Sequence, residues 1–192
     1  MNRTPKGQLS KSDVPSATDP EILQRLACGE LSALGELYDQ YNGIVRRFIA
    51  RATADAEDVD DLVHLTFLAA AKSAKKYDGR ASCRPWLMGI AVQLLRRRRR
   101  GLGRFLGLLS ALIGSRSGNV DPRAALHARN DVKRALLQLS EPKRVTFLMA
   151  ELEGLSCDEI AGALGIPIGT VWTRLHAARR ELRQLLEGDR EP

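Results

Sequence analysis

Apolar residues recur every three or four positions along most of the chain, a spacing that places them on one face of a helix. One such stripe, between about Leu31 and Ala52, consists of Leu34, Leu37, Tyr38, Tyr41, Ile44, Val45 and Phe48. No run of residues alternates between apolar and polar from one turn signal to the next, so strands are not expected. The pattern therefore predicts an all-α protein.

The first hundred residues are expected to hold four helices, which start at about residues 19, 31, 54 and 86. Asp19 is the expected N-cap of the first helix, with Pro20 at its first helical position. The segment YDGRASCRP (77–85) separates the third helix from the fourth, which runs into five consecutive arginines. We expect these helices to form one small domain over residues 19–100, after a disordered tail at 1–18.

Residues 101–121 are rich in glycine and serine, and we interpret them as a flexible linker. They include the apolar stretch FLGLLSALIG (105–114), which is too short to cross a bilayer, because a spanning helix needs roughly 20 residues. This stretch either docks on a partner or forms a short helix in a groove of the protein itself. A second small helical domain is expected at 122–188, with helices over 124–139 and from Glu141.

The segment SCDEIAGALGIPIGTVWTRL (156–175) has the form of a helix-turn-helix. Ser156 and Glu159 match a capping box at the start of the first helix. Gly165 allows the positive φ that a tight turn needs, and Pro167 ends the first helix and can start the second.

The second helix of this motif has an apolar and a polar side. Its inward positions are Val171, Leu175, Ala178 and Leu182. Its front and flanks carry Ile168, Thr170, Trp172, Thr173, Arg174, His176, Ala177, Arg179 and Arg180. The N-terminal part of such a helix enters the major groove of DNA, and its arginines suit phosphates. An ordinary helical hairpin with a solvated polar face is the alternative.

The net charge of +7 and the isoelectric point of about 9.7 indicate a polyanionic partner, either nucleic acid or an anionic membrane. The charges are also separated along the chain. Five acidic residues lie within 55–61, whereas 84–104 contains seven arginines and no acid. This separation suits a protein that contacts another protein on one side and DNA on the other.

The sequence contains no constellation that indicates an enzyme, a metal site or a cofactor. Cys28, Cys83 and Cys157 lie far apart, and so do the three histidines. We see no paired carboxylates, no nucleophile with a base and no glycine-rich phosphate loop, so we expect no small-molecule substrate. The cysteine usage and the lack of an apolar N-terminal region favour a cytoplasmic protein.

Two blocks of the sequence resemble the bacterial sigma factors, in particular the extracytoplasmic-function group. The second domain resembles region four through LLQLSEPKRVTFLMAELEGLSCDEIAGALGIPIGTVWTRLHAARRELRQLL. The first resembles region two through DDLVHLTFLAAAK and KKYDGRASCRPWLMGIAV. The resemblance covers roughly 20–100 and 122–187. It implies two helical domains that bind core RNA polymerase and the −10 and −35 elements of a promoter, with no bond made or broken. It also implies a nucleoid-associated protein and an anti-sigma factor as a partner, one that could hold the chain at the membrane.

The resemblance places polymerase binding on the third predicted helix. The residues implied are Asp60, Asp61, His64, Leu65 and Leu68. Members of the family usually carry Gln-Glu where this chain has His64-Leu65, so the contact with polymerase is expected to be altered here. A solvated acidic helix start is the alternative for the carboxylates.

For the −10 element, the resemblance implies the loop 77–85 and the helix that follows it. The candidate residues are Tyr77, Asp78, Arg80, Ser82, Arg84, Gln93, Arg96, Arg97 and Arg100. The loop would capture a flipped base, and the arginines would bind phosphates. The family commonly has Asn at position 93 and Asp at position 97, so both residues are departures.

For the −35 element, the resemblance implies the second helix of the helix-turn-helix. The candidate residues are Thr170, Trp172, Thr173, Arg174, His176, Ala177, Arg179 and Arg180. The family often has basic residues where Trp172 and Ala177 stand, which predicts an unusual −35 sequence with apolar contact to thymine methyl groups.

Three other functions are compatible with parts of the sequence. The first is a DNA-binding regulator of sigma-like fold that does not bind polymerase productively. The second is an enzyme with an appended helix-turn-helix, such as a recombinase. The third is a helical protein of the membrane surface that uses 96–113, which would leave the helix-turn-helix unexplained.

Overall fold

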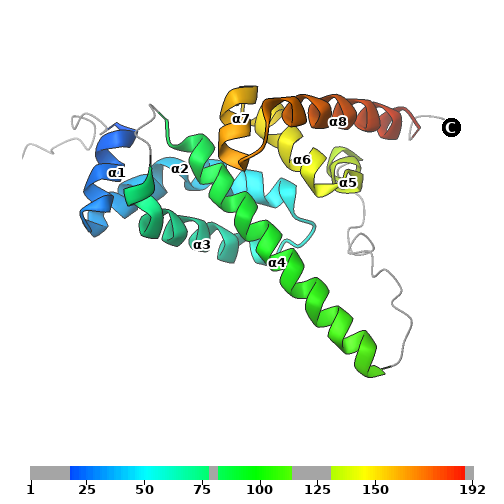
Figure 1. Cartoon of the computed structure of the whole chain (residues 1–192), viewed down its shortest axis with the longest axis horizontal. Coiled ribbons are helices and arrows are strands. Elements are labelled where there is room, and N and C mark those ends of the chain that lie inside the picture. The colour runs from blue at the N-terminus through cyan, green and yellow to red at the C-terminus, as the bar shows by residue number, and fades with distance from the viewer. Residues whose placement is uncertain (1–17, 78–81, 114–130, 189–192) are drawn as a thin grey trace, which may run out of the picture.

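The computed structural model describes residues 18–77, 82–113 and 131–188 (Figure 1). Every regular element in these ranges is helical, which confirms the predicted all-α fold. In chain order the elements are α1 (Asp19–Ala27), α2 (Leu31–Ala52), α3 (Asp58–Ser73), a 3₁₀ turn (Ala74–Lys76), α4 (Arg84–Ile113), α5 (Asp131–Gln138), α6 (Glu141–Phe147), a π-helical turn (Leu148–Leu152), α7 (Cys157–Leu164) and α8 (Ile168–Gly188).

The start of α1 differs by one residue from the prediction. Thr18, not Asp19, is the N-cap, and its backbone N–H donates to the Glu21 carboxylate over 2.8 Å. Asp19 is the first helical residue, and its side chain turns inward to accept a hydrogen bond from Tyr41. A carboxylate held in the interior is not available to cap its own helix.

Helix α3 starts four residues later than the sequence pattern predicts. The residues before it form a turn in which side chains accept backbone hydrogen bonds. The Asp55 N–H donates to the Thr53 hydroxyl, and the Glu57 N–H donates to the Asp55 carboxylate. Short polar side chains of this kind compete with helix formation, so the helix begins only at Asp58.

Helix α4 is longer than predicted. The sequence indicated an end near the arginine run, but the helix continues through the first part of the predicted linker to Ile113. Glycines in this part cost about 1 kcal/mol each relative to alanine, and the intervening leucines are good helix formers. Figure 1 shows the C-terminal part of α4 extending away from the other helices. The rest of the predicted linker, 114–121, lies outside the described residues.

The second domain contains the predicted helix-turn-helix. Ser156 Oγ accepts from the Glu159 N–H over 3.2 Å, and the Ser156 N–H donates to the Glu159 carboxylate over 2.8 Å. Gly165 has a φ of 63°, in the left-handed region, and α8 begins directly after Pro167. The capping box and the glycine turn are therefore both confirmed. Of the helix predicted over 124–139, the structure describes the part that forms α5.

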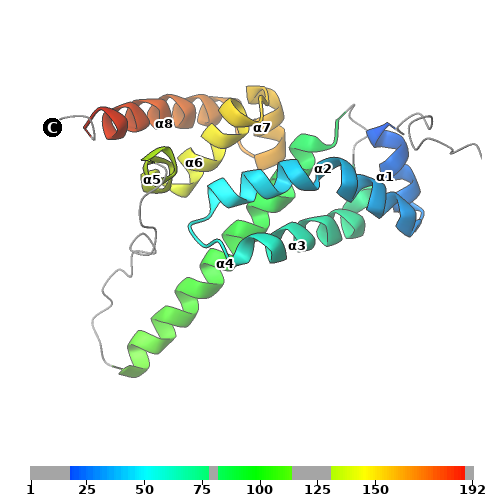
Figure 2. The same cartoon turned by 180° about the vertical axis from the view of Figure 1, so that it is seen from behind.

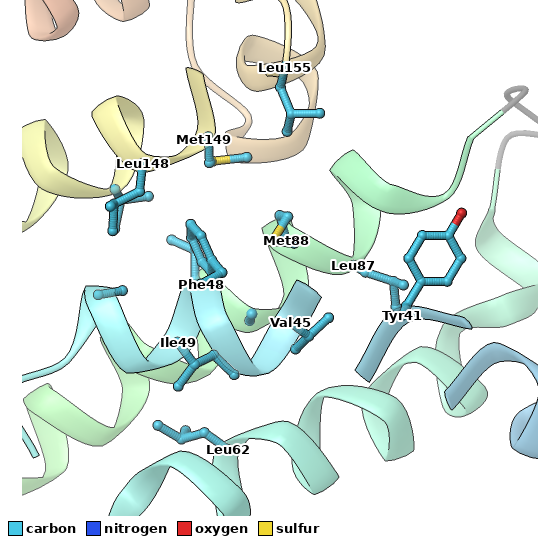
Figure 3. Packing of buried hydrophobic residues seen from close by; sticks show 14 of the residues in the cluster. Tyr41, Val45, Phe48, Ile49, Leu62, Leu87, Met88, Leu148, Met149 and Leu155 are labelled. Carbon is cyan, nitrogen blue, oxygen red and sulfur yellow. The ribbon is translucent and has the colours of Figure 1, made fainter. Parts of the chain in front are cut away.

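The two halves of the chain pack against each other and share one apolar core. Leu148 and Met149, from the π-helical turn, point toward Phe48 of α2 and Met88 of α4 (Figure 3). Where α4 crosses α7, a Cβ added to Gly89 would lie 2.5 Å from the Ala163 carbonyl oxygen, so the two backbones touch. Figure 2 shows α7 lying against the N-terminal half of α4.

Among the described residues, none of the helices combines the length and the apolar character needed to cross a membrane. The same residues contain no group of three or more His, Cys, Asp or Glu side chains placed to hold a metal ion.

Candidate nucleic-acid interface

Helix α8 exposes the face that the sequence predicts to be the reading face. Its four predicted inward residues are all buried, so the helix is fixed in its rotation about its own axis. On the opposite side Trp172 is 61% exposed and Ile168 is 38% exposed. Thr173 and His176 are exposed beside them, whereas Thr170 and Ala177 are half-buried. A tryptophan this exposed contributes little to the core and is free to contact a partner.

The three arginine candidates on α8 have different surroundings. The Arg179 guanidinium donates to the Glu151 carboxylate over 2.9 Å through Nε, so a phosphate would have to compete with that acid. Arg180 is exposed. Arg174 is half-buried, and its guanidinium has one buried nitrogen without a hydrogen-bond partner among the described residues. Because that nitrogen is buried, it does not itself offer a donor to a phosphate on the surface.

The predicted −10 residues lie around the start of α4, in part outside the described residues. Asp78 and Arg80 belong to that undescribed part. Tyr77 packs on Trp86 with ring centroids 5.3 Å apart, which places Trp86 in a structural role. Ser82 Oγ accepts from the Arg84 N–H over 3.3 Å, and Gln93 is exposed on α4.

Two of the predicted phosphate-binding arginines form ion pairs with the second domain. Arg84 donates to Glu153 over 2.6 Å, and that carboxylate is only 5% exposed. Arg96 donates to Glu141 over 3.0 Å, and Arg99 reaches the same carboxylate at 3.5 Å. Glu141 is the first residue of α6 and Glu153 follows the π-helical turn, so both acids are distant from α4 in sequence. Sequence reasoning missed these pairs, because no local pattern links residues from different domains.

The arginine run borders a shallow hollow of about 390 Å³, lined by Arg96, Arg99, Arg100 and Glu141. Arg97 and Arg100 are exposed, whereas Arg98 pairs with Asp58 at the start of α3. This part of α4 therefore presents a strongly positive surface, next to a single acid from α6.

The predicted polymerase-binding residues occupy one exposed face of α3. All five are exposed, and the two leucines are unusually so, at 45% for Leu65 and 51% for Leu68. The buried residues Val59, Leu62, Val63, Thr66 and Phe67 lie on the other side of the helix. Asp60 pairs with Arg46, and His64 stacks on Tyr38 with ring centroids 6.2 Å apart. The face thus combines acidic charge with exposed apolar surface, as a protein-binding surface does.

Cys83, immediately before α4, is fully buried. Burial and, to a lesser extent, the neighbouring Asp19 carboxylate raise the pKa of its thiol. The thiol therefore stays protonated at physiological pH and is poorly suited to act as a redox sensor.

Two known protein families match separate parts of the chain. Sigma-70 region 2 matches residues 37–105, which include α3 and most of α4. Sigma-70, region 4 matches residues 129–182, which include the helix-turn-helix.

Similar proteins match both parts together. The ECF RNA polymerase sigma factor SigL from Mycobacterium tuberculosis (strain ATCC 25618 / H37Rv) is 31% identical over 165 residues, which cover 84% of this chain and 93% of SigL. The ECF RNA polymerase sigma factor SigE from Mycolicibacterium smegmatis is 30% identical over 168 residues. That alignment covers 83% of this chain but only 65% of the length of SigE.

A solved structure has the same fold. The sigma factor RpoE from Bartonella quintana, in complex with the anti-sigma factor NepR, superposes with a TM-score of 0.66. The alignment covers 81% of this chain and 98% of that one at 24% sequence identity.

Proposed function

We propose how the surfaces described above act in transcription initiation, given that the chain belongs to the extracytoplasmic-function RNA polymerase sigma factors. A sigma factor binds core RNA polymerase and directs it to promoters. In this chain the exposed face of α3 binds the polymerase, the start of α4 with its arginine run binds the −10 element, and the exposed face of α8 reads the −35 element.

The observation that carries the proposal is the rotation of α8. Four buried apolar residues fix that helix so that Trp172, Thr173 and His176 face outward together. The N-terminal half of a recognition helix is the part that reaches base edges in the major groove. Trp172 supplies an apolar surface that suits thymine methyl groups.

Polymerase binding is assigned to α3 because that helix alone among the candidate surfaces is both acidic and apolar. Carboxylates favour a basic partner surface, and burial of the exposed leucines against a partner is favourable because it removes apolar surface from water. The family resemblance implies Gln-Glu where this chain has His64-Leu65, so an exposed leucine stands in this proposed contact where an acid is expected.

The ion pairs of Arg84 and Arg96 bear on how DNA is bound. Both arginines are held by acids of the second domain, so phosphates must displace Glu153 and Glu141. Binding of the −10 element therefore includes separation of these α4 arginines from Glu141 and Glu153. An anti-sigma factor is a further proposed partner in the cytoplasm, and this chain carries out no covalent chemistry itself.

The test is transcription from purified components. The full chain is combined with core RNA polymerase and fragmented genomic DNA of the source organism, and transcript start sites are sequenced. A double variant, Leu65→Ser with Leu68→Ser, is assayed beside the wild type, with pull-down of core polymerase as a second readout. Trp172→Ala provides the matched variant on the DNA side.

We expect discrete start sites that share two upstream motifs at a fixed spacing. The α3 variant should lose both polymerase binding and transcription, whereas Trp172→Ala should keep polymerase binding and lose promoter-specific starts. If the wild type binds polymerase but yields no specific starts while a control sigma factor does, the assignment of promoter recognition is wrong.

A further inference from the structure

A buried carboxylate lies where α1, α2 and the start of α4 meet. Asp19 is only 6% exposed, and three donors converge on it. Its Oδ2 accepts from the Tyr41 hydroxyl over 2.6 Å and from the Cys83 backbone N–H over 2.7 Å, and its Oδ1 accepts from Gln40 Nε2 over 3.1 Å. In Figure 3 the Tyr41 hydroxyl points away from the labelled apolar side chains.

Among the described residues, the three hydrogen-bond donors that reach this carboxylate are all neutral, so within that part of the chain it is buried without direct pairing to a lysine or arginine. Burying an uncompensated charge is costly, and such a site persists only where hydrogen bonds and local dipoles stabilise it. Asp19 lies at the N-terminus of α1, whose dipole favours an anion. Tyr41 and Gln40 hold the carboxylate from α2, and this leaves Oδ2 aimed at the backbone of Cys83.

The Cys83 N–H is not part of the helical ladder of α4, because that helix starts at the next residue. Backbone donors at a helix start need a partner from elsewhere, and here Asp19 supplies it. The Cys83 carbonyl accepts from the Leu87 N–H over 2.9 Å, so residue 83 is tied on both sides. Its neighbours in sequence are Ser82 and Arg84, two of the proposed −10 contacts.

We infer that Asp19 is a positioning residue for promoter opening: by holding the Cys83 backbone N–H, it fixes the backbone from which Ser82 and Arg84 reach the −10 element. The inference rests on the proposed function of that segment. Asp19 lies in the first turn of α1, sixty-four positions before Cys83. The inference gives it a role in DNA melting that its place in the sequence does not indicate.

The alternative is that Asp19 only stabilises the fold, and three variants separate the two. Asp19→Ala removes the acceptor. Asp19→Asn keeps an oxygen for the Cys83 N–H, since the Gln40 amide can turn its own oxygen toward the new NH₂ group. Tyr41→Phe removes a hydrogen bond from the same carboxylate but leaves the bond to Cys83, and is the matched control for loss of stability.

Two readouts are taken on the full chain. The first is hydrogen exchange of the Cys83 amide, which tests the hydrogen bond from this amide to Asp19 without any DNA. The second is permanganate reactivity of unpaired thymines in a promoter taken from the genomic transcription experiment, with core polymerase present. Binding to core polymerase and thermal unfolding are measured for each variant.

We expect slow exchange of the Cys83 amide in the wild type. In Asp19→Ala the exchange should be faster and promoter opening should fall about tenfold, the effect of losing a hydrogen bond to a charged group. Polymerase binding should be unchanged. Asp19→Asn and Tyr41→Phe should both stay within about threefold of the wild type in promoter opening.

Fast exchange of Cys83 in the wild type overturns the inference, even if Asp19→Ala does not fold. So does a loss of opening in Tyr41→Phe that equals the loss in Asp19→Ala, because the effect then follows stability alone. If the wild type binds polymerase but opens no promoter, the proposed function fails and the inference falls with it. Slow exchange of the Cys83 amide would then show that its hydrogen bond to Asp19 has a structural role only.

Discussion

Trp172 offers the sharpest test at the scale of a single residue. Because 61% of its surface is exposed, Trp172→Ala should change the free energy of unfolding by no more than about 0.5 kcal/mol. Loss of a base contact costs about 1–3 kcal/mol, so promoter affinity should fall at least about fivefold. Fluorescence anisotropy with a labelled promoter fragment and thermal unfolding measure the two quantities.

The control for this substitution is Leu31→Ala, which removes a leucine that is 79% exposed at the start of α2. It should leave promoter affinity unchanged. Equal losses of affinity in the two variants would show that exposed apolar surface in general, and not the reading face of α8, is responsible.

Single residues could be predicted from the sequence where their role is local. Ser156 caps α7 and Gly165 adopts a positive φ, as their neighbours in the sequence indicated. Asp19 shows the limit, because the same residue type that caps helices can instead accept hydrogen bonds in the interior. Its partners Tyr41 and Cys83 are distant along the chain, and only the packing of α1 on α2 brings them together.

At the scale of elements, two glycines in the helix-turn-helix give opposite predictions. Gly165 has a φ of 63°, which is unfavourable for a residue with a Cβ, so Gly165→Ala should destabilise the chain by about 1 kcal/mol. Gly169 lies in the first turn of α8 with open space around its Cα, so Gly169→Ala should stabilise the chain by up to about 1 kcal/mol. Thermal unfolding measures both, and equal signs would contradict the turn geometry described here.

The residues at which a helix begins and ends could be predicted only where the sequence marks those ends clearly. Helix α2 has the bounds that its apolar stripe predicts, whereas α3 and α4 do not. At α3 the carboxylate of Asp55 and the hydroxyl of Thr53 form a turn, which a count of apolar positions does not detect. At α4 the glycines beyond the arginine run suggested a linker, although isolated glycines weaken a helix without ending it.

At the scale of the whole molecule, the packing of the two domains could not be predicted from the sequence. Periodicity identified Phe48 as apolar and inward, but not that it would face Leu148 of the other domain. The candidate surfaces were likewise predicted one helix at a time. Whether an arginine of α4 faces solvent or an acid of the second domain depends on that packing, and no motif encodes it.

Gly89 tests this packing directly. A Cβ at that position would lie 2.5 Å from the Ala163 carbonyl oxygen, which belongs to the backbone of α7 and cannot turn aside. Gly89→Ala should therefore push α4 and α7 apart and raise the radius of gyration in small-angle X-ray scattering. Gly35→Ala, in α2 with open space around it, is the control and should leave the scattering unchanged. Identical scattering from all three proteins would mean that the domains do not pack this way in solution.

Glu141 links the packing of the domains to DNA binding. Its carboxylate holds Arg96 and Arg99, so Glu141→Gln should release both guanidinium groups for phosphates. An exposed or partly exposed ion pair contributes about 0.2–1 kcal/mol, and promoter affinity at low salt should therefore rise by up to about fivefold. Glu36→Gln removes the same charge from a pair with Arg25, on helices α2 and α1 that carry none of the proposed DNA contacts, and controls for net charge. If both variants bind the promoter equally well, overall charge explains the gain, and Glu141 does not compete with DNA for these arginines.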